Sequence, residues 1–237
     1  MALPKIGYPT YELELPSTGK NIKYRPFLVK EEKVLLLALD SKDEKQVINA
    51  VKDLIKNCVT TRIKVDTLPS FDLEYLFLKI RGASIGENII LTVTCLDDNE
   101  TQVEANINID DVEVFKPEGH DKKIMFDDKT GIVMKYPSMK EFVEREFLQK
   151  EMKTEEVYDY IADSIDQIFD DEEVYDSSTT TKKEFRTFVD SLTTKQFEKI
   201  QKFYETSPKL SHTFKVINPN TKKESSYTIE GLQSFFA

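Results

Sequence analysis

The apolar positions near the N-terminus follow first a strand pattern and then a helix pattern. Tyr11, Leu13 and Leu15 alternate with glutamates, and the chain returns at residues 22–24 after a Pro-Ser-Thr-Gly turn, which predicts a β-hairpin. Helices are predicted at 30–39 and 43–58. In the second of these helices, one face collects the apolar side chains Val47, Val51, Leu54, Ile55 and Cys58.

The stretch at residues 70–81 is apolar nearly all round, which is typical of a helix inside a core or an obligate interface. Ser70 is the expected N-cap of this helix, because its hydroxyl can accept a hydrogen bond from a backbone amide of the first turn. Beyond Gly86 the period changes to two, and a β-hairpin is predicted over 88–110 with a polar tip at 97–100. Three further short strands are expected, at 112–115, 124–126 and 132–134. Residues 1–137 are therefore predicted to form an α+β domain of helices packed on a small antiparallel sheet, with the helix at 70–81 buried.

Residues 138–207 are predicted to be a mostly helical region. Ser138 and Glu141 fit a capping box, and the helix they begin is expected to continue to about Ile168 along an apolar stripe that includes Ile161 and Ile165. Residues 170–181 are rich in acids, serines and threonines and are predicted to be a flexible linker. Two more helices follow, and each begins at a capping box, Thr181–Glu184 and Thr193–Gln196.

The last part of the chain, residues 208–237, is predicted to be a C-terminal β-hairpin. Its strands are expected at 210–217 and 225–229, joined by a turn of Asn and Pro residues at 218–221. Leu232, Phe235 and Phe236 are expected to anchor the end of the chain through apolar contacts.

Charge is concentrated in one segment. The chain holds 43 acidic and 33 basic residues, a net charge of −10, and the acidic segment at 151–176 holds eleven acids and a single lysine, a net of −10 by itself. The rest of the chain is neutral, and the acidic balance argues against coating nucleic acid or an anionic membrane. On the predicted helix the acids outside the apolar stripe are candidates for contact with a basic partner: Glu156, Asp159, Asp163, Asp166 and Asp170. The alternative interpretation of the same residues is a solvated helix face.

The sequence contains no recognisable motif for catalysis, metal binding or cofactor binding. The chain has neither a phosphate-binding loop nor a Gly-x-Gly-x-x-Gly or His-Glu-x-x-His motif. Cys58 and Cys95 are the only cysteines, and His120 and His212 the only histidines, so a zinc site would need ligands from distant segments. The pair of helices at 182–206 has a net charge of only +2, too weak for a DNA-binding helix-turn-helix. We expect no catalytic residue, no metal and no cofactor, and no segment is apolar over the roughly 20 residues that cross a bilayer.

One stretch carries a family resemblance. The sequence LPSFDLEYLFLKIR at 68–81, with SIGE at 84–87, resembles the most recognisable part of the T-even-type bacteriophage baseplate hub family. Three more segments are similar to that family, at 3–27, 134–137 and 230–236. Together they are spread in order over nearly the whole chain.

The resemblance implies a part in building the central hub of the phage baseplate. The leading expectation is a non-enzymatic assembly factor, a chaperone for a hub or tape-measure protein, present in the host cytoplasm during assembly. The alternatives are a permanent structural subunit of the hub in the virion tail and, less favoured, a tail-associated hydrolase. The implied partners are other baseplate hub or tape-measure proteins, without nucleic acid and without membrane insertion.

The resemblance also raises the question of zinc. Some relatives carry Cys-x-x-Cys at the tips of the two hairpins. Here the tips are Cys95-Leu96-Asp97-Asp98 and Ile217-Asn218-Pro219-Asn220, and this departure argues against a zinc role in this chain.

Overall fold

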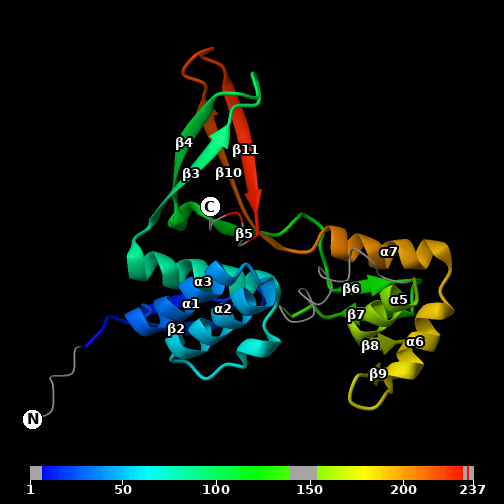
Figure 1. Ribbon diagram of the computed structural model, residues 1–237. Helices are drawn as coiled ribbons and strands as arrows, with labels where there is room; N and C mark the ends of the chain where they lie inside the picture. Colours follow the sequence, from blue (N-terminus) through cyan, green and yellow to red (C-terminus); the bar gives the residue numbers. More distant parts are fainter. Residues whose placement is uncertain (1–6, 139–153, 232–233, 235–237) are drawn as a thin grey trace, which may run out of the picture. The chain divides into compact units, whose positions relative to one another are not determined.

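The computed structural model describes residues 7–138, 154–231 and 234. The chain divides into two compact units (Figure 1). The first unit is made of Met1–Phe115 and Lys209–Ala237, and the second unit of Lys116–Pro208. The mixture of helices and antiparallel sheets confirms the α+β class.

The first unit opens with the predicted hairpin and helices. Its elements are β1 Tyr11–Glu14, β2 Asn21–Tyr24, α1 Val29–Ser41, α2 Glu44–Cys58, the 3-10 turn η1 Val65–Thr67 and α3 Ser70–Ile85. Strands β1 and β2 pair antiparallel, as the alternation predicts. The N-cap of α3 is Pro69, whereas the prediction placed it at Ser70. The extended backbone of Pro69 already leads into the helix, so Ser70 is the first helical residue.

Helix α3 is the core helix of the first unit, as predicted. Leu73, Leu76, Phe77, Leu78 and Ile80 are all buried. A helix with apolar residues on every side needs neighbours on every side, and α3 contacts α2, β5 and β10.

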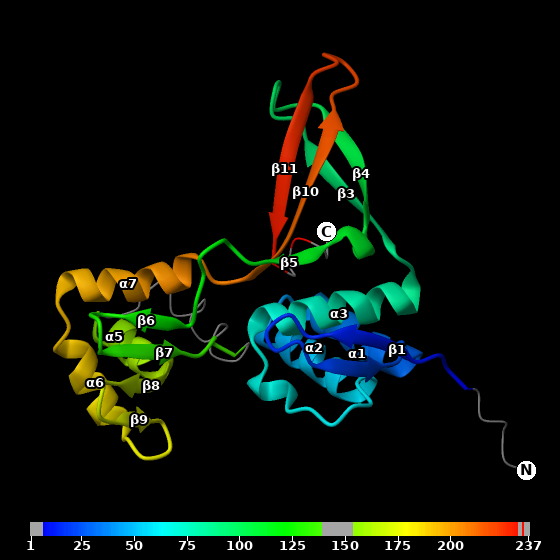
Figure 2. The ribbon, with the colours of Figure 1, turned by 180° about the vertical axis from the view of Figure 1, so that it is seen from behind.

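Two β-hairpins lie side by side above α3 in the first unit (Figures 1 and 2). Their elements are β3 Asn88–Thr94, β4 Gln102–Asn108, the 3-10 turn η2 Ile109–Asp111, β5 Glu113–Phe115, β10 Lys209–Ile217 and β11 Glu224–Glu230. β3 pairs with β4, and β10 lies between β11 and β5 in a second sheet. The inward faces of both hairpins share one buried cluster with α3, including Leu78, Ile107 and Leu210. The C-terminal hairpin is therefore part of the first unit.

The second unit is an antiparallel sheet covered by helices. Its strands are β6 Lys123–Met125, β7 Gly131–Met134, β8 Ile165–Phe169 and β9 Val174–Asp176, in the order β6-β7-β8-β9. Its helices are α5 Thr154–Asp163, α6 Lys182–Asp190 and α7 Thr194–Glu205. The capping boxes predicted for α6 and α7 are both confirmed. Sheet and helices share a core that includes Ile132, Ile165, Phe185 and Ile200.

Two sequence predictions in the second unit are wrong. The helix expected to continue to Ile168 ends at Asp163, and Ile165–Phe169 is strand β8, because these residues pair with β7 and bury Ile165 and Ile168 against the helices. The expected linker at 170–181 instead contains strand β9, which pairs with β8, and ends at Thr181, the N-cap of α6. As a result, β6 and β7 belong to the same sheet as β8 and not to an N-terminal domain ending at 137. Glu141 of the expected capping box and the anchor of Leu232, Phe235 and Phe236 lie outside the described residues.

Candidate functional site

The five candidate acids lie on three different elements of the second unit. Glu156, Asp159 and Asp163 belong to α5, Asp166 is in strand β8, and Asp170 follows the end of β8. They do not form one helix face, because the helix ends before Asp166. The prediction of a single acidic helix surface is therefore wrong for Asp166 and Asp170.

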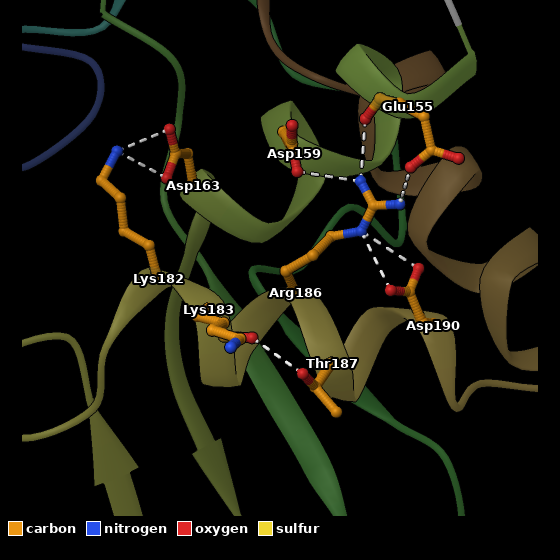
Figure 3. A network of polar contacts seen from close by, with 8 residues as sticks. All are labelled: Glu155, Asp159, Asp163, Lys182, Lys183, Arg186, Thr187 and Asp190. Carbon is orange, nitrogen blue, oxygen red and sulfur yellow. Dashed lines mark hydrogen bonds and ion pairs between the residues drawn. The ribbon is translucent and has the colours of Figure 1, made fainter.

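Glu155, Asp159 and Asp163 of α5 are ion-paired within the unit. Arg186 of α6 binds Glu155 at 2.7 Å, Asp159 at 2.9 Å and Asp190 at 3.0 Å (Figure 3). One guanidinium nitrogen also donates to the backbone carbonyl of Glu155 at 2.8 Å, and the guanidinium lies over the ring of Tyr158. The Arg186 side chain is only 18% exposed.

The environment of Arg186 favours the charged form that it already has at neutral pH. Burial lowers its pKa, but the hydrogen bonds that Arg186 donates to Asp190, Glu155 and Asp159 outweigh that effect and raise the pKa above its ordinary value. A guanidinium can hold several carboxylates at once because its donors point in fixed, different directions. We call Arg186 with Glu155, Asp159 and Asp190 the Arg186 cluster.

Two lysines bind further acids of the segment. Lys182 contacts Asp163 at 2.7 Å (Figure 3), and Lys129 pairs with Asp171. Sequence reasoning found the acids but missed Arg186, Lys129 and Lys182, because each cation comes from a segment far along the chain. The Arg186 cluster and these pairs partly neutralise the acidic segment.

Asp170 holds a turn. Its carboxylate accepts hydrogen bonds from the backbone amides of Glu173 at 2.8 Å and Glu172 at 2.9 Å, and these bonds lower its pKa. Asp176 binds the amides of Ser178 and Thr179 in the same way. These two aspartates therefore order the chain on both sides of β9, and the turn between them exposes Asp171, Glu172 and Glu173.

A hollow of about 530 Å³ lies beside this turn. It is lined by Thr130, Ile168, Phe169, Asp170, Tyr175, Thr179, Thr180, Glu184 and Phe188. Three of these side chains are aromatic, and Asp170 and Glu184 add carboxylates. No sequence pattern indicated the hollow, because its walls form only when β8 pairs with β7 and β9. We call it the acidic-rimmed hollow.

A second polar cluster joins the tips of the two hairpins of the first unit. The side-chain amide of Asn218 donates to Asp97 at 2.9 Å and to Asp98 at 2.8 Å, and the hydroxyl of Thr221 donates to Asp97. Asn218 is only 1% exposed. Nearby, the hydroxyl of Tyr227 donates to the carbonyl of Thr94 at 2.7 Å. We call Asp97, Asp98, Asn218 and Thr221 the tip cluster.

The tip cluster does not fit a zinc ion. Amide and hydroxyl groups occupy positions where a structural zinc site needs thiolates or imidazoles, and Asn218 already uses its amide hydrogens on the two carboxylates. Burial, together with Asp97 and Asp98, raises the pKa of Cys95, which is opposite to the effect a zinc ligand requires. Over the described ranges, no group of three or more His, Cys, Asp or Glu side chains could hold a metal ion.

The remaining cysteine and the two histidines are not arranged as a Cys–His catalytic pair. Burial raises the pKa of Cys58 to about 11, so its thiol is protonated and unreactive at neutral pH. His120 binds Thr206 and Tyr136, and His212 binds the carbonyl of Asp111. In the part of the chain that the structure describes, no helix is long and apolar enough to cross a bilayer.

The fold is that of a two-unit α+β protein. Residues 8–237 match the family model of the T4 bacteriophage base plate protein, and because this match covers nearly the whole chain, the chain belongs to that family. No curated protein and no solved structure matches it.

Proposed function

We propose that the protein acts in the assembly of the baseplate hub by binding another phage protein, a hub subunit or the tape-measure protein, and that it catalyses no reaction. Membership of the baseplate family supports the setting, and the acidic-rimmed hollow is the observation that carries the binding role. During assembly the protein then works in the host cytoplasm, within the growing tail.

The chemistry of the acidic-rimmed hollow specifies the partner segment. Phe169, Tyr175 and Phe188 offer aromatic surface for an apolar side chain. The turn at residues 170–176 contributes five acids and no base, so bases next to that apolar side chain are favoured. The preferred partner is therefore an apolar residue flanked by Lys or Arg.

The structure changes the choice of residues for testing this contact. Asp159 and Asp163 are bound to Arg186 and Lys182, so replacing them would disturb α6 as well as any binding surface. Glu172 is exposed in the turn that follows Asp170, and Tyr175 lines the hollow at 40% exposure. These two positions test the contact more directly.

The binding experiment uses the full chain to capture hub and tape-measure proteins from phage-infected cells. Glu172→Lys should weaken capture about fivefold, as expected for reversing one exposed charge, and Tyr175→Ser about tenfold or more. Glu198→Lys makes the same charge change at an exposed position of α7 and should have no effect. Capture that is unaffected by these two variants and by salt would reject this contact site.

The assembly role has its own test. A transient assembly factor leaves the particle, whereas a permanent hub subunit is retained. We expect mass spectrometry of purified tails to find the protein absent or far below one copy per hub component. Stoichiometric copies in mature virions would show a structural subunit instead, and peptidoglycan cleavage by the purified protein would show a hydrolase.

A further inference from the structure

Helix α1 of the first unit carries an exposed apolar surface. Val29 is 80% exposed, Leu37 60%, Leu36 54% and Val34 52%. Single exposed aliphatic residues are common on protein surfaces, but four on one helix of 13 residues form a patch. Helical spacing places Val29, Leu36 and Leu37 on the side where Lys33 and Asp40 also lie. We call these residues together with Val34 the α1 face.

The α1 face is not needed to hold the helix in place. On the opposite side, Leu35 and Ala38 are buried in the first unit. Glu31, also buried, binds Arg25 at 3.1 Å and accepts a hydrogen bond from the amide of Leu28 at 2.6 Å. The helix is thus fixed by its inner side, and the α1 face is available to another molecule.

The charges of the α1 face are complementary to those of the same face on a second copy of the chain. If a second copy of α1 runs antiparallel, with a two-fold axis between Leu36 and Leu37, each Leu36 packs against the other copy's Leu37. The same axis places Lys33 opposite Asp40 in both directions, because the two residues are equally far from the axis. Within the described residues, neither Lys33 nor Asp40 has an ion-pair partner in its own chain.

The charge matching is confined to α1, because the helix ends at Ser41 and the left-handed backbone of Lys42 turns the chain away from the helix axis. Lys33 and Asp40 are the charged residues of the α1 face, so the axis brings no like charges together on it. Such matching is the requirement for an isologous interface, in which one patch must recognise itself.

We propose that the α1 face is a self-association surface and that two copies of this chain pair through antiparallel α1 helices. A helix of 13 residues is about 20 Å long, so a contact confined to it has the small area of a weak, concentration-dependent dimer. Such a dimer brings two copies of the chain to one partner assembly.

The first test measures the mass of the full-length protein by sedimentation velocity over a wide concentration range. The wild type should pass from monomer to dimer, and Leu36→Glu and Leu37→Glu should each remain monomeric with an unchanged circular dichroism spectrum. Ile90→Glu, a matched change at a position 60% exposed on β3, should dimerise like the wild type. A wild type that stays monomeric, or a Leu36→Glu variant that still dimerises, would overturn the proposal.

The second test exploits the charge pair. Lys33→Asp and Asp40→Lys should each weaken the dimer about tenfold, because each places like charges opposite one another twice. The double variant Lys33→Asp/Asp40→Lys should regain wild-type affinity, which only this antiparallel arrangement explains. Failure of the double variant to recover contradicts the pairing. If the wild type is monomeric and Leu36→Glu instead abolishes capture of a hub or tape-measure protein, the α1 face binds that protein and the proposal is wrong.

Discussion

His120 shows how a single buried residue is held in one protonation state. The hydroxyl of Thr206 donates to the carbonyl of Lys202 at 2.7 Å, so its oxygen accepts from Nδ1 of His120 at 2.9 Å. Nε2 is then the acceptor for the hydroxyl of Tyr136, also at 2.9 Å. In this arrangement both nitrogens of the neutral ring are satisfied, one as donor and one as acceptor. Burial lowers the pKa of His120, and the nearby Lys116 adds to this effect.

A pH dependence of stability follows from this lowered pKa. The unfolded chain takes up a proton on His120 near its ordinary pKa of about 6.5, while the folded chain does so only at lower pH. The stabilisation is therefore complete above about pH 6.5 and is lost as the pH falls toward the folded-state pKa. Urea unfolding of the wild type between pH 8 and 5.5 should show this decrease. In His120→Asn the free energy of unfolding should decrease less over this pH range, because His120 no longer contributes. An equal decrease in both proteins would show that His120 is not the group responsible.

Asn218 is the residue on which the tip cluster depends. Asn218→Asp replaces the donor between Asp97 and Asp98 with a third carboxylate, and we expect a loss of about 3 kcal/mol in the free energy of unfolding. Asn220→Asp is the control, because it makes the same change at an exposed neighbour in the same turn. Denaturation curves of both variants measure the difference. A chelator should leave the Tm of the wild type unchanged, and a large decrease would mean that a metal holds the tips.

At the scale of elements, the sequence correctly predicted the helices and the hairpin that have a clear local period. α1, α2, α3 and the hairpin of β3 and β4 all have a clear period, and the capping boxes of α6 and α7 are local signals as well. The boundary between α5 and β8 has no such signal, because Ile161, Ile165 and Ile168 continue helical spacing while the chain changes to a strand. Pairing with β7 decides that boundary, and β7 lies about 30 residues earlier. The arrangement of the candidate acids could not be predicted for the same reason, since the cations that bind them come from other elements.

The Arg186 cluster is the contact between α5 and α6 that can be tested separately. Arg186→Ala removes the cation that binds Glu155, Asp159 and Asp190, so the second unit should melt at a lower temperature. The difference from the wild type should shrink in 1 M salt, because all three carboxylates are exposed enough to be screened. Lys183→Ala removes one charge from the exposed side of the same helix and should change the Tm little. A decrease that is independent of salt would show that packing of Arg186 on Tyr158 dominates.

On the scale of the whole molecule, the order of segments in the chain differs from their order in space. The sequence suggested three consecutive regions, because composition and period change near 138 and 208. The structure joins the first and last segments in one unit, since β10 pairs with β5 as well as with β11. That pairing connects residues about 95 positions apart, and no local pattern could predict it.

The chain passes from the first unit to the second, and back again, at neighbouring positions of one strand pair. Phe115 and Lys209 are directly opposite each other in the antiparallel pair of β5 and β10. A two-residue Asn-Gly turn that replaces residues 116–208 should therefore close the pair as an ordinary hairpin, and the shortened chain should fold cooperatively. Urea unfolding followed by circular dichroism measures this. A chain ending at Phe115 is the control, and it should fail to fold because Leu78 and Val112 lose the cover of Leu210.

The position of β10 also sets the timing of folding during translation. The ribosome makes α3, β3 and β4 early, but the strand that covers their apolar side follows only after the roughly 90 residues of the second unit. At about 5–20 residues per second, this leaves the nascent chain incomplete for about 5–20 seconds. During that interval the second unit can form its own core, while the first part exposes the apolar surface to which aggregation or a host chaperone can respond. Slow codons within 116–208 would lengthen this vulnerable period, and the same codons after residue 230 would not.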